Sequence, residues 1–297
     1  MALIACLLAI DRVTALMLDF AYAHSGASPL AQVRAANADT VVVGTSTAKY
    51  AFFPKSWPSQ MVNIAQDGQT VLFSIGMAVA LRDSPNVKRI IVGIDPYDLR
   101  SGLDNPSAVR IWRIAPLIYK QPEIASLLER TRPATQAPIS LASWRFRGSA
   151  HKVIERIGRN APPPYRSLPQ GEVEIPVLDR TPPKQKPRIH PSLHEYLLRL
   201  HDVLIASGQQ LVLVVTPAYL NLRWDLPDQT PLLDELVARL SGVKLCDLTK
   251  LETEQYKSLI RDPENFHDNI HLTRKGAKRY TKFIARSVES SCPSSVH

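Results

Sequence analysis

Short apolar runs alternate with amphipathic stretches along most of the chain after residue 39. The apolar runs are rich in Val, Ile and Leu and end at Gly, Asp, Thr or polar residues, which is typical of buried strands. They cover residues 40–43, 61–65, 88–94, 210–215 and 243–248. These runs predict the strands of one sheet.

Helical segments are predicted between the strands. Residues 71–81 are apolar almost all round, and Ser192 with Glu195 forms a capping box at the start of a leucine-rich stretch. Two more helices are predicted over residues 230–242, where Pro231 is the first helical residue, and 273–288. Because helices alternate with strands, we expect an α/β fold with three α/β/α layers and a mostly parallel five-stranded sheet. In such a sheet, sites lie in loops at the carboxyl ends of the strands.

The alternation stops between residues 97 and 190, where many prolines occur. We interpret this stretch as a proline-rich insertion or lid within a single domain that spans residues 37–290. Residues 1–36 are predicted as an N-terminal helix and residues 291–297 as a tail.

The first ten residues form an uninterrupted apolar run that ends at Asp11 and Arg12. The run is shorter than a bilayer span and lacks the basic start of a signal peptide. Two interpretations remain open: a part of a membrane anchor, or an amphipathic or core helix.

The composition excludes several classes of protein. The chain has 297 residues, 45% of them hydrophobic, and 36 Lys+Arg against 27 Asp+Glu give a formal net charge of +9. These values argue against disorder, and 24 prolines argue against a coiled coil. The excess charge lies in residues 144–190 and in the last helix, and the rest of the chain is near neutral. These positions are suited to meeting an anionic glycan or a membrane surface, although a solvated basic face is the plainer explanation. No nucleic-acid-binding signature accompanies the charge, so nucleic acid is not expected as a partner.

Cofactor and metal chemistry find no support in the sequence. There is no glycine-rich phosphate loop, and the histidines lack the spacing of a metal site, so neither a cofactor nor a metal is expected. Three cysteines, at positions 6, 246 and 292, are too few for a disulfide framework and leave the redox compartment open.

Two segments carry residues suited to nucleophilic catalysis. Ser46 follows the first strand directly, at the edge of the sheet where such sites lie, although a serine there can also cap a helix. Asp268 and His271 are three residues apart before the last helix, so a carboxylate can orient an imidazole that acts as a general base. His267 competes with His271 for the role of base.

The order of these motifs resembles the SGNH/GDSL hydrolase superfamily. The motifs are Gly44-Thr45-Ser46, Asn63 followed by Gly68, and Asp268-x-x-His271-Leu272 before a terminal helix. More narrowly, the chain resembles membrane-anchored SGNH-like proteins of bacterial envelope and exopolysaccharide pathways, often esterases or O-acyltransferases. The resemblance implies Ser46 as nucleophile, His271 as base and Asp268 as its partner, with the backbone N–H groups of Ser46 and Gly68 as oxyanion donors.

One block departs from the family pattern. Gly93-Ile94-Asp95 stands where the family has Gly-x-Asn, and an ionised Asp95 accepts hydrogen bonds but cannot donate one to an oxyanion. Asn63 is a candidate replacement donor, and Asp95 could instead cap a helix or hold a loop.

We therefore expect a serine-dependent esterase or O-acyltransferase that acts on acyl esters of a cell-envelope glycan, or on a small acyl ester. The alternative is an inactive SGNH-like protein that binds polysaccharide or assembles with partners. The resemblance also implies an extracytoplasmic location, with the N-terminus at a membrane surface.

Overall fold

The computed structural model describes residues 2–24, 28–69, 71–95, 191–219, 243–248 and 253–290. It also describes the single positions 141, 142, 146, 150, 154, 238, 240 and 292. The predicted insertion over residues 97–190 and the predicted helix over 230–242 lie almost entirely outside these residues.

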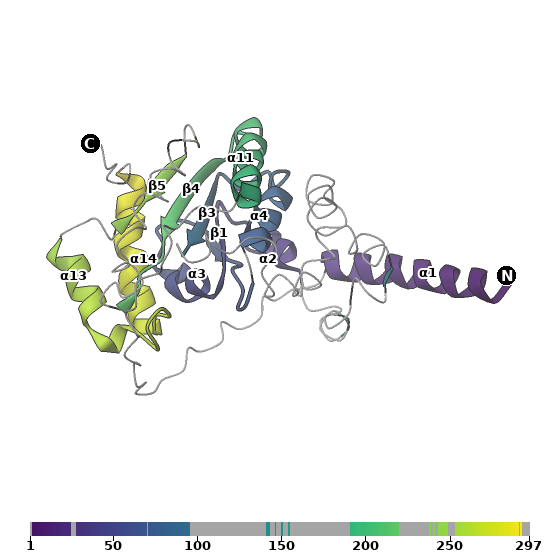
Figure 1. The fold of residues 1–297 in the computed structure, drawn as a ribbon, viewed down its shortest axis with the longest axis horizontal. Helices are drawn as coiled ribbons and strands as arrows, with labels where there is room; N and C mark the ends of the chain where they lie inside the picture. The colour runs from purple at the N-terminus through teal and green to yellow at the C-terminus, as the bar shows by residue number, and fades with distance from the viewer. Residues whose placement is uncertain are drawn as a thin grey trace.

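The centre of the molecule is one parallel sheet with strand order β2-β1-β3-β4-β5 (Figure 1). The strands are β1 (Thr40–Gly44), β2 (Met61–Asn63), β3 (Arg89–Ile94), β4 (Gln210–Val215) and β5 (Lys244–Cys246). Each predicted apolar run overlaps one of them, and the fold class predicted from the sequence is confirmed.

Helices precede, separate and follow the strands. They are α2 (Pro29–Ala35), α3 (Ser46–Ala51), α4 (Val71–Ala80), α11 (Pro191–Ala206), α13 (Glu254–Arg261) and α14 (Arg274–Glu289). Two short 3-10 turns, η1 (Pro54–Ser56) and η6 (Pro263–Asn265), precede β2 and follow α13.

Alternate residues of each central strand face opposite layers. In β1, Val41 and Val43 belong to a core that includes residues of α4 and α11, whereas Val42 belongs to a second core with residues of α3, α13 and α14. The strands are buried on both faces because a layer of helices packs against each face of the sheet. This arrangement forms the three layers and brings α3 and α14 to the same side of the sheet.

The N-terminal residues form two helices rather than the single one predicted. The helix α1 (Ala2–His24) projects from the body of the molecule, and α2 follows it (Figure 1). Asp11 of α1 accepts a hydrogen bond of 3.1 Å from the backbone N–H of Ala142. Within the described residues, no helix combines the length and the apolar character that a bilayer span requires.

A disulfide joins β5 to the residues that follow α14. Its partners are Cys246 and Cys292, whose Cα atoms lie 5.2 Å apart, within the usual range for a disulfide. Both residues are buried. The sequence alone did not indicate this pairing, because 46 residues separate the two cysteines and no motif relates them.

Candidate active site

Ser46 occupies the first position of α3, directly after β1. The helix approaches the sheet closely because Gly44 and Gly93, paired in register across β1 and β3, have no side chains. A Cβ added at Gly44 or at Gly93 would lie 2.3 or 2.4 Å from the Cβ of Ala48, which no real contact permits. The two glycines therefore provide the space in which Ala48 seats α3 on the sheet, and this seat determines where Ser46 lies.

A short loop before α14 carries the other two predicted residues. It closes on itself through a backbone N–H of His267 that donates to the carbonyl of His271 at 2.7 Å. One carboxylate oxygen of Asp268 accepts from the backbone N–H groups of Ile270 and His271, at 2.9 and 2.8 Å. Asp268 thus holds the loop that presents His271.

The side chains of the three predicted residues form a continuous hydrogen-bonded line. His271 Nε2 lies 2.8 Å from Ser46 Oγ, and His271 Nδ1 lies 2.6 Å from Asp268 Oδ2. An ionised carboxylate accepts only, so Nδ1 carries the proton and Nε2 accepts from the serine hydroxyl. This is the geometry of a nucleophile, a general base and an orienting carboxylate.

The pKa of Asp268 is consistent with an ionised carboxylate. Burial makes the largest single contribution and by itself would raise the pKa. Hydrogen bonds from the His271 side chain and from the backbone N–H groups of Ile270 and His271, together with the charge of His271, outweigh burial and lower the pKa from 3.8 to about 2. Asp268 therefore remains a negative partner for the imidazolium that forms when His271 takes a proton.

Two residues of α3 that sequence reasoning missed also line this region. Tyr50 packs edge-on against the His271 ring, with 5.0 Å between ring centroids, and Lys49 forms an ion pair with Asp67. They follow Ser46 by four and three positions, so helical spacing places all three on one face of α3. This spacing is the sequence signal that could have indicated Lys49 and Tyr50 as site residues. The Lys49–Asp67 pair ties the loop after β2, which contains Gly68, to α3.

Gly68 lies in the loop after β2 in the left-handed region, with φ of 60°. A residue with a side chain is strained there, so the position favours glycine. Near it, Gln66 donates its backbone N–H to the carbonyl of Gly44 at 3.2 Å, which attaches the loop to the end of β1. The loop that carries Gly68 is thus fixed beside the strand that ends one residue before Thr45.

Asn63 has a role different from the predicted one. Its amide nitrogen lies 3.3, 3.1 and 3.0 Å from the carbonyl oxygens of Ala48, Lys49 and Phe52, and its Oδ1 accepts from the backbone N–H of Ala65. The amide hydrogens therefore point to the end of α3 and not to a position beside Ser46. Asn63 fixes the helix that carries the nucleophile because the last carbonyls of a helix need donors.

Asp95 and His267 complete the set of predicted residues. Asp95 lies at the carboxyl end of β3 and is 3% exposed. In the described residues no hydrogen bond joins His267 to Ser46, whereas His271 makes one. His271 is thus the histidine in position to act as the base. The described part of the chain contains no group of three or more metal-binding side chains.

Comparison with known proteins adds little to this geometry. No family model and no curated protein matches the chain. A solved structure described as "a putative platelet activating factor from Streptococcus pneumonia" is similar at a TM-score of 0.40 and 12% sequence identity, over 97% of this chain and 99% of that one. At this level of similarity the functional argument rests on the site.

Proposed function

We propose that the chain is a serine-dependent acyl-ester enzyme of the SGNH type, an esterase or O-acyltransferase. The observation that carries the proposal is the line from Ser46 Oγ through His271 to Asp268, with distances of 2.8 and 2.6 Å. Residues from opposite ends of the sequence meet within hydrogen-bond reach at the edge of the sheet where parallel α/β proteins hold their sites.

In the first half of the reaction, Ser46 Oγ attacks the acyl carbonyl carbon and its proton passes to His271 Nε2. The carbonyl electron pair moves to the oxygen, which accepts hydrogen bonds from the backbone N–H groups of Ser46 and Gly68. The tetrahedral intermediate then expels the alcohol, which takes the proton from His271. An acyl group remains on Ser46.

In the second half, His271 takes a proton from water or from a sugar hydroxyl, and the resulting oxygen nucleophile attacks the acyl-enzyme. The tetrahedral intermediate then collapses, and His271 returns its proton to the departing Ser46 Oγ. This step yields a free acid or an acylated glycan and restores the enzyme. Asp95 in place of an amide removes one oxyanion donor, which typically costs about 10² to 10³ in rate. We therefore expect a slow enzyme, with acyl esters of a cell-envelope glycan as its substrates.

Hydrolysis of a neutral aryl acetate tests the proposal. Ser46→Ala removes the nucleophile, and Ser287→Ala removes a hydroxyl that donates, among the described residues, to the Phe283 carbonyl of its own helix. We expect turnover by the wild-type protein and by Ser287→Ala and none above background for Ser46→Ala. Equal rates for all three would refute catalysis by Ser46. Glycan binding without turnover would instead favour the inactive, polysaccharide-binding alternative.

We also propose that the protein works in an extracytoplasmic compartment. The Cys246–Cys292 disulfide supports this location, because such bonds persist in oxidising compartments. Alkylation of the protein isolated from its native cells tests it: the two cysteines should resist a thiol reagent until a reductant is added. Rapid alkylation before reduction would oppose the proposal.

The exposed apolar side chains of α1 support contact with a membrane surface. Leu3, Leu16 and Phe20 are 72, 72 and 68% exposed, which is costly in water. We expect the protein to float with phosphatidylcholine vesicles and a Leu3→Asp/Leu7→Asp variant to stay in the soluble fraction. The matched variant Ile205→Asp removes a residue of α11 that is 57% exposed and should float as the wild type does. Loss of flotation in Ile205→Asp alone would contradict a role for α1.

A further inference from the structure

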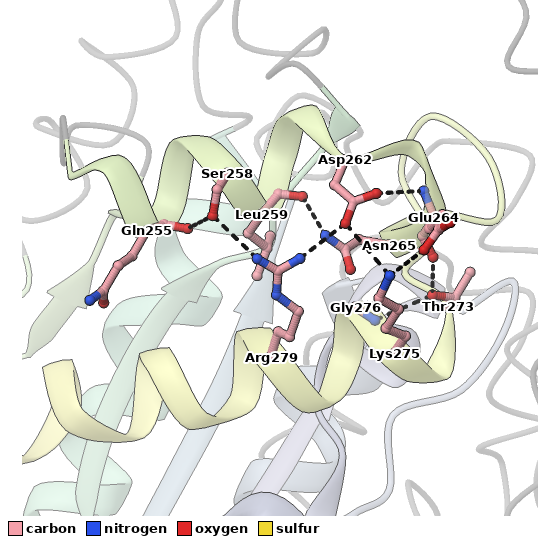
Figure 2. A network of polar contacts seen from close by, with 10 residues as sticks. All are labelled: Gln255, Ser258, Leu259, Asp262, Glu264, Asn265, Thr273, Lys275, Gly276 and Arg279. Atoms are coloured by element: carbon pink, nitrogen blue, oxygen red, sulfur yellow. Dashed lines mark hydrogen bonds and ion pairs between the residues drawn. The ribbon is translucent and has the colours of Figure 1, made fainter.

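The basic residues of α14 fall into two groups with different surroundings. On one face, Arg279 donates to Asp262 at 3.1 Å and to Ser258 at 3.2 Å, and Lys275 forms ion pairs with Glu264 and with Asp262 (Figure 2). These contacts join α14 to α13 and η6. The charges of this face are therefore balanced by acids within the protein.

On the other face of α14, the basic residues lie against an aromatic ring. The Arg274 guanidinium and the Lys278 ammonium lie over the ring of Phe53, at 5.4 and 5.5 Å from its centroid. Across the described residues neither cation forms an ion pair or a hydrogen bond. Lys282 lies one turn further along the helix and is exposed. We call Arg274, Lys278 and Lys282 the open basic face.

The ring of Phe53 gives this face a defined geometry. Phe53 is only 5% exposed, and its backbone N–H donates to Thr281 Oγ1 of α14 at 2.8 Å, so the ring is fixed against the helix. Cations over a fixed aromatic face lose little additional freedom when an anion arrives. Cβ atoms four residues apart on a helix are about 5 to 6 Å from one another, so Arg274 and Lys278 present their charges at the interval of one turn.

The open basic face begins at the end of the loop that carries His271. Arg274 is three residues beyond His271 and starts the helix that the site loop leads into. Phe53 follows α3, the helix that Ser46 begins, after one residue. A polymer bound along the first turns of α14 therefore reaches the loop that carries His271.

We propose that the open basic face binds a carboxylate-bearing polysaccharide and presents its acyl esters to Ser46. The acyl ester in this inference rests on the proposed function. The anionic polymer rests on the charges of the open basic face. Two cations on consecutive turns match an anion repeated along a chain better than a single small carboxylate. Nucleic acid has repeated charge but no acyl ester, so a basic face that begins at the His271 loop favours the polysaccharide.

Binding of polygalacturonate by the full chain tests the proposal, with neutral dextran as the reference polymer. Arg274→Ala/Lys278→Ala removes two charges from the open basic face, and Lys275→Ala/Arg279→Ala removes two from the paired face of the same helix. We expect the first variant to bind polygalacturonate about tenfold or more weakly and the second within about threefold of the wild type, at one fixed salt concentration. Thermal unfolding of both variants shows that they are folded.

Equal loss in both variants would overturn the proposal, because it would indicate a response to net charge alone. Tighter binding of duplex DNA or of anionic vesicles than of polygalacturonate through Arg274 and Lys278 would also overturn it. Failure of the proposed function can be told apart from failure of this inference. Ser46→Ala should bind polygalacturonate as the wild type does. If the wild type binds polygalacturonate but does not hydrolyse an aryl acetate, the proposed catalysis is refuted and the proposed binding surface is not.

Discussion

Ser46 and His271 lie 225 residues apart in the sequence and reach the site by different kinds of interaction. On the Ser46 side, close packing positions α3: Ala48 rests on Gly44 and Gly93, where no Cβ fits. On the His271 side, hydrogen bonds to Asp268 position the loop. The position of Ser46 therefore depends on two glycines that lack side chains, and the position of His271 depends on hydrogen bonds to Asp268. An added side chain should disturb Ser46, whereas loss of the carboxylate should disturb His271.

Removal of the base has the largest expected effect. His271→Ala leaves Ser46 without an acceptor for its proton, and we expect turnover of an aryl acetate to fall by about 10⁴-fold or more. His267→Ala is the matched control, because the loop contains both histidines and only His271 reaches Ser46 Oγ. Steady-state rates of both variants provide the measurement. A larger loss in His267→Ala would assign the base to the other histidine.

Removal of the Asp268 charge has the second largest expected effect on turnover. In Asp268→Asn the amide donates to Nδ1, which favours the tautomer with the proton on Nε2 and stops Nε2 from accepting the Ser46 proton. We expect kcat to fall by about 10³ to 10⁴ while KM changes little. Circular dichroism should show an unchanged fold. A variant with kcat near the wild-type value would show that Asp268 does not orient His271.

Added atoms on the Ser46 side should act through packing. In Gly93→Ala the new methyl group meets Ala48, so we expect a loss of about 1 to 3 kcal/mol in the free energy of unfolding. Displacement of α3 should also lower turnover by about tenfold to 100-fold. Gly208→Ala places a methyl group in open space at φ of 73°. It should cost stability by about 1 to 2 kcal/mol and leave turnover unchanged.

Denaturant titrations measure the loss of stability in each variant, and steady-state rates measure turnover. Equal turnover in Gly93→Ala and the wild type would contradict the close-packing account of the Ser46 side.

The smallest expected effect is a loss of stability in acid, caused by protonation of Asp268. The pKa of Asp268 is lowered from 3.8 to about 2 in the folded protein, so its stabilising contribution is present above the higher value and is lost as pH falls through the lower one. We expect the free energy of unfolding to decrease between about pH 4 and pH 2 by a larger amount in the wild type than in Asp268→Asn. Parallel curves for the two proteins would contradict the contribution of Asp268.

The sequence predicted the parts of the fold that depend on local pattern. The apolar runs located all five strands, and Thr273 marked the start of α14 because its side chain caps the helix. The expectation that Ser46 meets His271 came from the family resemblance of the motifs and their order along the chain.

Contacts set by tertiary structure were not predictable. Asn63 appeared free to donate to an oxyanion because the sequence does not show that the end of α3 lies beside it and takes its amide hydrogens. The Cys246–Cys292 pairing and the cations over Phe53 likewise join segments with no common motif. These features depend on how the helices pack on the sheet.

Covalent labelling of Ser46 tests the central claim most directly. A fluorophosphonate reacts with a serine whose hydroxyl is activated by a neighbouring base, so mass spectrometry of the full chain after reaction reports that activation. The account predicts one adduct on the peptide that contains Ser46, absent in Ser46→Ala and strongly reduced in His271→Ala. An unlabelled wild-type protein, or an adduct on another serine that persists in Ser46→Ala, would contradict it.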